Sequence, residues 1–410
     1  MLIANVRGLL DARHPLWMCG LRPFFLLAAL AALLLMLMWL AFLGHGLPLP
    51  STVGGPFVWH AHELLFGFAF AAMAGFLLTV VPEFTGGGDF EAKPVRWLTL
   101  FWLVGRVAFW SSGWLGAPAL AVSGLAHLAL LGSLAWLTAP RLWRDPERKH
   151  LAFLWAVAGL ALCVAGFYVD ALRGEFPARW LHATLGLFMI LIIVALSRIS
   201  MRIVNHALEE AGIEGVEYRA RPPRRNLAIF CIGLYTVAEF ALPASRLSGW
   251  LALAAAAAVF NLMNDWHIGR VLLRQRPLMF YGVYVAMAAG YATMGIALVF
   301  ETSAISAGRH LLAVGALGLA IYAVMGIAGR AHCGQLFETR LWFPLGACLL
   351  ALAALVRAFA AWPGIDPLRP LLTAALLWCV AYGLFAWHMA PLFIAPRADG
   401  LGGCKGTAIP

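Results

Sequence analysis

The chain has 410 residues, of which 63% are hydrophobic and only 12% are charged. Soluble globular proteins are roughly half apolar and about a quarter charged, so this composition excludes a soluble fold, a disordered chain and a disulfide-rich secreted domain. The net charge of +10 does not indicate nucleic-acid binding, because the basic residues lie in short connections between apolar segments, where positive-inside topology places them. The composition therefore predicts a helical protein that crosses a membrane several times.

Long apolar stretches follow one another along the whole chain. A bilayer core needs about 20 apolar residues per helix, and stretches rich in Ala, Leu, Gly and Trp without strict alternation are typical of helices rather than barrel strands. We therefore predict an all-α polytopic membrane protein with about twelve transmembrane helices. The predicted spans are 24–44, 57–82, 95–113, 117–139, 150–171, 177–200, 225–245, 248–268, 277–300, 306–330, 341–362 and 368–393.

The basic residues predict the orientation of these spans. With the N-terminus inside, 22 of the 29 Lys and Arg residues fall in cytoplasmic segments and six in outer segments, which places both termini in the cytoplasm. We expect no cleaved signal peptide, because the apolar run that follows the basic N-terminus is of spanning length. The seven cysteines are odd in number and contain no C-x-x-C pair, so we predict no disulfide framework.

The longest connection suggests how the chain is organised. We predict one integral-membrane domain over 1–410, in which six-span halves at 1–200 and 225–396 are joined by a cytoplasmic loop at 201–224. The halves show no convincing sequence echo. The Gly-rich segment at 397–410 is predicted to be a flexible tail.

The twelve histidines are a large share of the polar chemistry of this chain. An ionisable group within a membrane span is a functional candidate by default, and neutral imidazole is a usual ligand of haem iron, copper and zinc. On the predicted topology the histidines form an outer and a cytoplasmic layer. The outer layer contains His45, His60, His62, His127, His182 and His310, and the cytoplasmic layer contains His14, His150, His206, His267, His332 and His388.

The densest cluster is Trp59-His60-Ala61-His62-Glu63 at the outer end of the second span. Each residue of an α-helix turns by about 100°, so His60 and His62 point to different faces and can serve two sites. One imidazole can ligate a metal while the Glu63 carboxylate holds an imidazole in place. The alternative is a hydrated helix end with interfacial aromatic residues.

His182 and His310 begin the sixth and tenth spans in the same layer. Together with the second-span histidines they offer imidazoles from three helices at similar depth, as a haem or mononuclear metal site between helices requires. A lone interfacial histidine is more often structural than a metal ligand, so neither of them alone indicates a metal site. For His332, in the cytoplasmic layer, a metal-binding role and a structural role both stay open.

Arg106 lies near the middle of the third span and needs a partner there. An ion pair with Glu63 or Glu239 is one explanation. The other is a haem propionate held by the guanidinium group.

Several segments together resemble the NnrS family. They are Leu21-Arg22-Pro23-Phe24-Phe25-Leu26, Trp59-His60-Ala61-His62-Glu63, Phe66-Gly67-Phe68, Ala74-Gly75-Phe76-Leu77-Leu78-Thr79, Gly105-Arg106, His310 before Val314-Gly315-Ala316, and Ala390-Pro391. The family's proteins are twelve-span inner-membrane proteins that carry haem and copper and are associated with the bacterial response to nitric oxide. The resemblance thus implies haem b and copper as cofactors, nitric oxide as a small-molecule partner besides the lipid bilayer, and the bacterial cytoplasmic membrane as the location.

The resemblance favours His60, His62, Glu63, His310 and His332 as site residues. The chain also departs from the family pattern. Ala331-His332-Cys333-Gly334 stands where the family has Gly-His-Thr-Gly, and the family's histidines in the fifth and ninth spans match Tyr168 and Val283. The ligand set is therefore open, with His182 or His388 as replacements.

We predict a haem-binding and copper-binding membrane protein that acts on or responds to nitric oxide, with its metal held by histidines in the outer half of the bilayer. If it is an enzyme, it is an oxidoreductase in which Glu63, Glu239 or Tyr168 helps to deliver protons, with Glu63 as the predicted catalytic residue. The predicted cofactor-binding residues are His62, His310, His332 and Arg106, and the predicted metal ligands are His60, His62, His182 and His310.

Two other functions remain open. The first is a twelve-span secondary transporter of a small solute, which the span count and central loop support and the histidine layers oppose, because transporter sites lie near the midplane. The second is a metal-delivery protein for oxidase assembly, which the sequence supports less because it contains no Cys or Met pair at a ligating spacing.

Overall fold

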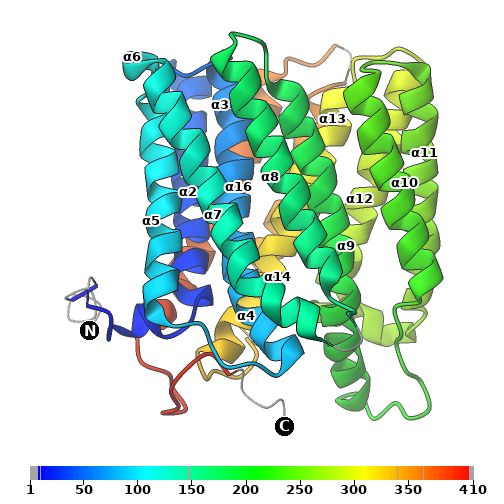
Figure 1. Ribbon diagram of the computed structural model, residues 1–410. Helices are drawn as coiled ribbons and strands as arrows, with labels where there is room; N and C mark the ends of the chain where they lie inside the picture. Colours follow the sequence, from blue (N-terminus) through cyan, green and yellow to red (C-terminus); the bar gives the residue numbers. More distant parts are fainter. Residues whose placement is uncertain (1–7, 10, 146–147, 339, 363, 406–410) are drawn as a thin grey trace. The chain divides into compact units, whose positions relative to one another are not determined.

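The computed structural model describes residues 8–9, 11–145, 148–338, 340–362 and 364–405. Within these ranges the chain forms helices and no strand, which confirms the all-α fold class (Figure 1). The elements are η1 Pro15–Met18, α2 Leu21–His45, α3 Gly55–His62, η2 Glu63–Ala69, α4 Phe70–Thr85, α5 Ala92–Trp110, α6 Ser112–Leu115, α7 Ala117–Arg144, α8 Leu151–Leu172, α9 Ala178–Glu209, α10 Pro222–Ala241, α11 Arg246–Met263, η3 Asn264–Trp266, η4 Gly269–Leu273, α12 Gln275–Val299, α13 Ile305–His310, η5 Leu311–Gly318, α14 Leu319–His332, α15 Trp342–Phe359 and α16 Leu368–Ile394.

Ten helices of the described chain are long and apolar enough to cross a membrane, so the protein is a multi-pass membrane protein. The two remaining predicted spans, 95–113 and 225–245, are also helices, α5 with 19 residues and α10 with 20 residues. Any 18 consecutive residues of either helix include three charged ones, whereas each of the ten contains an 18-residue apolar stretch with at most two. The charged residues are Lys93, Arg96 and Arg106 in α5, and Arg224, Arg225 and Glu239 in α10. That α5 and α10 also cross the membrane stays a prediction.

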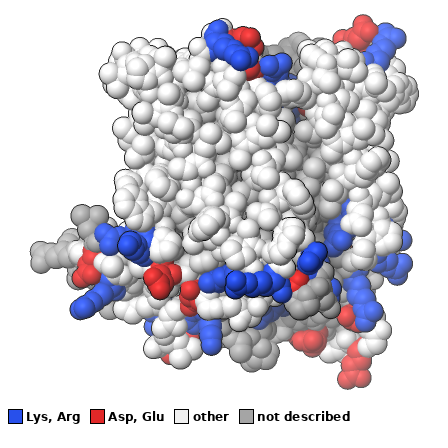
Figure 2. All heavy atoms as spheres, viewed as in Figure 1, with Lys and Arg blue, Asp and Glu red and all other residues white. Residues whose placement is uncertain are grey.

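The surface of the helices is what a bilayer requires. On the face seen in Figure 2, Lys, Arg, Asp and Glu gather near the helix ends, and the surface between the ends carries none of them. Large apolar side chains are exposed on the helices, such as Trp136 on α7 and Trp155 on α8, which are 81% and 68% exposed. Such exposure is unfavourable in water but favourable in lipid.

The chain divides into two compact units. Of the described residues, unit 1 contains those within Met1–Leu181, Val324–Gly346 and Cys379–Pro410, and unit 2 contains those within His182–Ala323 and Ala347–Trp378. In unit 1, α5 packs on α7, α7 on α8 and α2 on α4, and in unit 2, α12 packs on α11 and on η5. The six-span halves at 1–200 and 225–396 concern the membrane topology and stay a prediction.

The segment after α16 folds onto the cytoplasmic-predicted end of unit 1. The Arg397 side chain is buried, pairs with Asp399 at 2.5 Å and donates to the carbonyl oxygen of His332 at 3.2 Å. The structure also joins Cys404 to Cys19 in a disulfide, where the sequence predicted no disulfide framework. The predicted tail thus makes specific contacts over 397–405, and its last residues, 406–410, lie outside the described chain.

Candidate functional site

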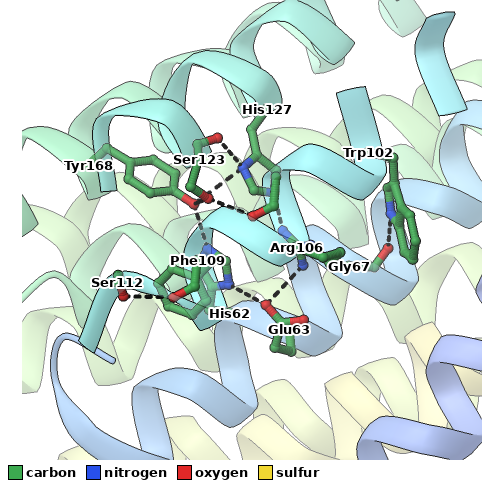
Figure 3. Close-up of polar contacts among 11 residues, drawn as sticks. His62, Glu63, Gly67, Trp102, Arg106, Phe109, Ser112, Ser123, His127 and Tyr168 are labelled. Atoms are coloured by element: carbon green, nitrogen blue, oxygen red, sulfur yellow. Dashed lines mark hydrogen bonds and ion pairs between the residues drawn. The ribbon is translucent and has the colours of Figure 1, made fainter. Parts of the chain in front are cut away.

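A closed ring of hydrogen bonds and ion pairs lies inside unit 1 (Figure 3). Its members come from the α3–η2 junction, α5, α7 and α8, and all of them are buried. We call this ring the His62 network. It consists of His62, Glu63, Arg106, Ser123, His127 and Tyr168.

His62 is held by both of its ring nitrogens. Nδ1 lies 3.0 Å from Oε1 of Glu63, and Nε2 lies 2.9 Å from the hydroxyl of Tyr168. A carboxylate that is ion-paired to Arg106 at 3.1 Å only accepts, so Nδ1 carries the proton. Nε2 therefore presents its lone pair and accepts from the Tyr168 hydroxyl. The ring also stacks on Phe109 at 3.5 Å between centroids.

Arg106 and His127 close the ring on the other side. One Arg106 nitrogen contacts Oε1 of Glu63 and the other contacts Nε2 of His127. Because a guanidinium only donates, His127 accepts at Nε2 and donates from Nδ1 to the carbonyl oxygen of Ser123, 2.7 Å away. The Ser123 hydroxyl then lies 2.6 Å from the Tyr168 hydroxyl. Both nitrogens of His127 thus have protein partners, which makes it a positioning residue.

Three glycines give the network its room. A Cβ at Gly67 would lie 2.7 Å from Nη1 of Arg106, and a Cβ at Gly124 would lie 2.8 Å from Cγ of Tyr168. A Cβ at Gly105 would lie 2.8 Å from Cε1 of His127 on α7. Such contacts are closer than carbon atoms tolerate, so each network side chain lies directly against the backbone of a neighbouring helix.

The histidine stands at the start of a π-helical segment. η2 runs over Glu63–Ala69, directly after His62, which ends α3. The carbonyl oxygen of Gly67 inside η2 accepts a hydrogen bond from Nε1 of Trp102 on α5 at 2.9 Å. Single-turn π segments are rare and are frequent at functional sites.

Some hydrogen-bonding capacity around the network is unused. The indole nitrogen of Trp59 is buried and makes no hydrogen bond in the described structure, whereas the Trp110 side chain hydrogen-bonds the Glu63 carboxylate. A buried polar atom without a partner costs about 1–3 kcal/mol. The Trp59 indole therefore favours a further polar partner near the site.

The donor set fits a metal ion better than a porphyrin. A buried imidazole whose Nδ1–H is held by a carboxylate is the arrangement of a metal-ligating histidine, with Nε2 as the ligand atom. The Tyr168 hydroxyl lies at that position, so a metal at about 2 Å from Nε2 requires this hydroxyl to move. A porphyrin would also displace the aromatic rings packed on His62, including Phe109 and Phe167. No group of three or more His, Cys, Asp or Glu residues arranged to hold a metal occurs in the described part of the chain.

The other residues predicted in unit 1 lie apart from the network. The His60 ring stacks on Trp39, with ring centroids 4.2 Å apart. His60 and His62 therefore lie on different faces of the helix, as the sequence predicted. His332 ends α14, where Nδ1 contacts the carbonyl oxygen of Cys404 and Nε2 lies 3.8 Å from Glu83.

In unit 2, the predicted residues lie near the outer-predicted ends of the helices. Nδ1 of His310 bonds the carbonyl oxygen of Ser306 at 2.7 Å. His182 lines a small cavity together with Glu239 and Arg309, which form an ion pair at 2.6 Å. Of the two ion pairs predicted for Arg106, the one with Glu63 is therefore confirmed.

Sequence reasoning pointed to His62, Glu63 and Arg106, placed His127 in the outer histidine layer and matched Tyr168 to a family histidine, but it did not point to Ser123. Ser123 and His127 lie four residues apart on α7 and so share a face, a spacing visible in the sequence. Which way that face points depends on packing against α5 and α8, which the sequence does not specify.

The fold and the network define a class: a polytopic helical membrane protein with a buried imidazole–carboxylate–guanidinium site in one of its units. The NnrS protein family model matches residues 15–397, so the chain belongs to the NnrS family. No curated protein shows significant similarity to it.

A solved structure shows the same overall fold. The chain is similar to the protein in a cryo-EM structure of a haem–copper terminal oxidase dimer, with a TM-score of 0.64 and 11% identity over 94% of this chain and 85% of the other. At this identity the similarity concerns the fold alone.

Proposed function

We propose that the protein carries haem or copper and acts on nitric oxide in the bacterial cytoplasmic membrane, with Nε2 of His62 as a ligand of a copper ion. One observation carries the proposal: a fully buried imidazole whose Nδ1–H is fixed by an ion-paired carboxylate. The membership in the NnrS family and the fold shared with a haem–copper oxidase support the choice of metal.

The residues around His62 have distinct tasks in this proposal. Glu63 fixes the tautomer and orientation of His62, and Arg106 holds Glu63 in an ion pair at 3.1 Å. Phe109 and the other packed rings exclude water, and the apolar interior takes up an apolar gas such as nitric oxide. A bound haem or copper centre would supply one-electron chemistry and a binding position for the gas. For turnover we propose that the Glu63 carboxylate accepts a proton and passes it on to the site.

The proposal includes the membrane arrangement predicted above, with twelve spans and both termini in the cytoplasm. The packing of α5 on α7 and the place of Arg106 in the buried network support a spanning α5. We propose His310, His332 and His182 as ligands of further metal centres and His60, whose ring stacks on Trp39, as a structural residue.

Two variants two residues apart on α3 test the proposal. We would purify the wild type, His62→Ala and His60→Ala, record optical spectra and measure bound iron and copper. We expect the wild type to carry stoichiometric metal, His62→Ala to lose it and His60→Ala, whose ring packs on Trp39, to keep it. A metal-free wild type would refute the proposal and favour the transporter, and equal metal contents in both variants would show that His62 is not the ligand.

A further inference from the structure

Unit 2 contains a small polar cavity where α9, α10, α12, α13 and η5 meet. Its volume accessible to the centre of a water molecule is about 10 Å³. Among its lining side chains are His182, Tyr235, Glu239, Tyr291, Met294 and Arg309. Everything that follows concerns unit 2 by itself and does not depend on the proposed metal centre.

The Tyr291 hydroxyl is the first sign that the cavity takes a ligand. Tyr291 is 0% exposed, lines the cavity and makes no hydrogen bond in the described structure. Buried hydroxyl groups are nearly always hydrogen-bonded to protein or to ordered water. The neighbouring phenol, Tyr235, uses its hydroxyl on Sδ of Met294 at 3.7 Å.

The ion pair in the cavity wall provides further partners. Nη2 of Arg309 donates to Oε1 of Glu239 at 2.6 Å, while the buried Nε of Arg309 has no hydrogen-bond partner. The wall thus presents two unused donor groups, from Tyr291 and Arg309, beside a carboxylate that accepts.

Charge and size together select the ligand. Since Glu239 and Arg309 neutralise each other, a bound cation would be repelled by the guanidinium group and a bound anion by the carboxylate. A neutral molecule that both donates and accepts hydrogen bonds satisfies the wall. A cavity of this volume holds one water, and an ordered water needs about two to four polar partners.

The helices around the cavity cannot move closer together to fill it. A Cβ at Gly186 on α9 would overlap Thr236 on α10, and a Cβ at Gly308 on α13 would overlap Met294 on α12. The helices around the cavity are therefore already at their closest approach.

We propose that this cavity is a hydration site that holds one water molecule between the Tyr291 hydroxyl and the Glu239–Arg309 ion pair. The site places an exchangeable water beside a carboxylate within an otherwise apolar helical unit.

Radiolytic labelling in water enriched in ¹⁸O tests the proposal on the full-length protein in lipid nanodiscs. Radiolysis of a bound water oxidises the side chains next to it, and the sites are read by mass spectrometry. α12 carries matched pairs at a spacing of seven residues: Met294 and Tyr291 face the cavity, whereas Met287 and Tyr284 are equally buried and do not line it. We expect labelling of Met294 and Tyr291 to exceed that of Met287 and Tyr284.

A conservative variant provides the second measurement. In Tyr291→Phe we expect the labelling of Met294 to fall to the level of Met287. Equal labelling of Met294 and Met287 in the wild type would overturn the hydration site. Undiminished labelling of Met294 in Tyr291→Phe would overturn the assignment of the Tyr291 hydroxyl as the group that holds the water.

Discussion

The ion pair between Glu63 and Arg106 is the part of the His62 network whose energy the structure constrains most directly. The charged atoms are 3.1 Å apart, and the two side chains are 0% and 9% exposed. At an effective dielectric constant of about 20, unit charges at this distance attract by about 5 kcal/mol. Removing one partner of such a buried pair typically costs about 3–5 kcal/mol, because the other charge stays buried without compensation.

We therefore expect Arg106→Met and Glu63→Gln each to lower the free energy of unfolding by about 3–5 kcal/mol. The double variant leaves neither charge buried, so its loss should be smaller than the sum of the two single losses. Coupling energies of neighbouring groups run from about 0.5 to 3 kcal/mol, and this pair belongs at the upper end. The measurement is reversible unfolding by SDS titration in mixed micelles, followed by tryptophan fluorescence.

A surface pair provides the control. Arg246 and Glu301 in unit 2 approach to 2.7 Å but are 70% and 69% exposed, so Arg246→Met should cost no more than about 1 kcal/mol. Additive losses from the Glu63 and Arg106 variants would show that the two groups do not interact energetically. The reasoning that makes this pair the anchor of the network would then be wrong.

Three further changes test other parts of unit 1. Tyr168→Phe removes the hydroxyl that covers Nε2 of His62, so we expect the free energy of unfolding to fall by about 1–3 kcal/mol. Copper should bind more tightly to this variant when measured by titration. Weaker copper binding would identify Tyr168 as a ligand instead. Gly124→Ala pushes against the Tyr168 ring and should cost about 1–3 kcal/mol, whereas Gly132→Ala, also on α7 with open space around its Cβ, should be neutral or stabilising in the same unfolding assay. Hydrogen bonding to the Arg397 guanidinium lowers the pKa of Asp399 to about 2. The stabilisation from the Asp399–Arg397 interaction is fully present above the ordinary pKa of about 4 and is lost as the pH falls through about 2. Pepsin should therefore cleave the docked segment faster at pH 2 than at pH 4, when each rate is divided by the rate for an unstructured peptide at the same pH. Equal normalised rates at the two pH values would contradict this expectation.

The fold was largely predictable because a bilayer imposes one simple rule on a sequence. Every predicted span is a helix in the structure, since apolar stretches of spanning length have no other way to satisfy their backbone in lipid. The two helices outside the ten apolar ones, α5 and α10, carry charged residues near their ends, and α5 also carries Arg106 within the buried network. The disulfide between Cys19 and Cys404 was not predictable, because 385 residues separate them and no local pattern links such distant positions.

The site was predictable only where it is local in sequence. His62 and Glu63 are neighbours in a polar cluster, and the need of Arg106 for a counter-charge in the membrane leads to Glu63. Tyr168 and Ser123 are different. An isolated tyrosine or serine in an apolar helix gives no sign of its partner, and the rotation of α7 and α8 that brings the two hydroxyls to 2.6 Å is set by packing at glycines.

The π segments limit helical-wheel reasoning to the residues before them and also reveal a short pattern shared by distant parts of the chain. In unit 1, His62 precedes η2, and in unit 2, His310 precedes η5. Both histidines are followed five residues later by a glycine, Gly67 or Gly315, whose missing Cβ admits a close neighbour. A π turn has more residues than an α turn, so it shifts the helical faces on either side of it relative to each other, and a constant 100° per residue misplaces whatever follows. The surroundings of the two histidines differ, since His62 is fully buried in the network whereas His310 is half-buried and bonded to the backbone. The shared pattern therefore specifies a backbone device that positions a histidine, and the ligand chemistry depends on the side chains that each unit packs around it.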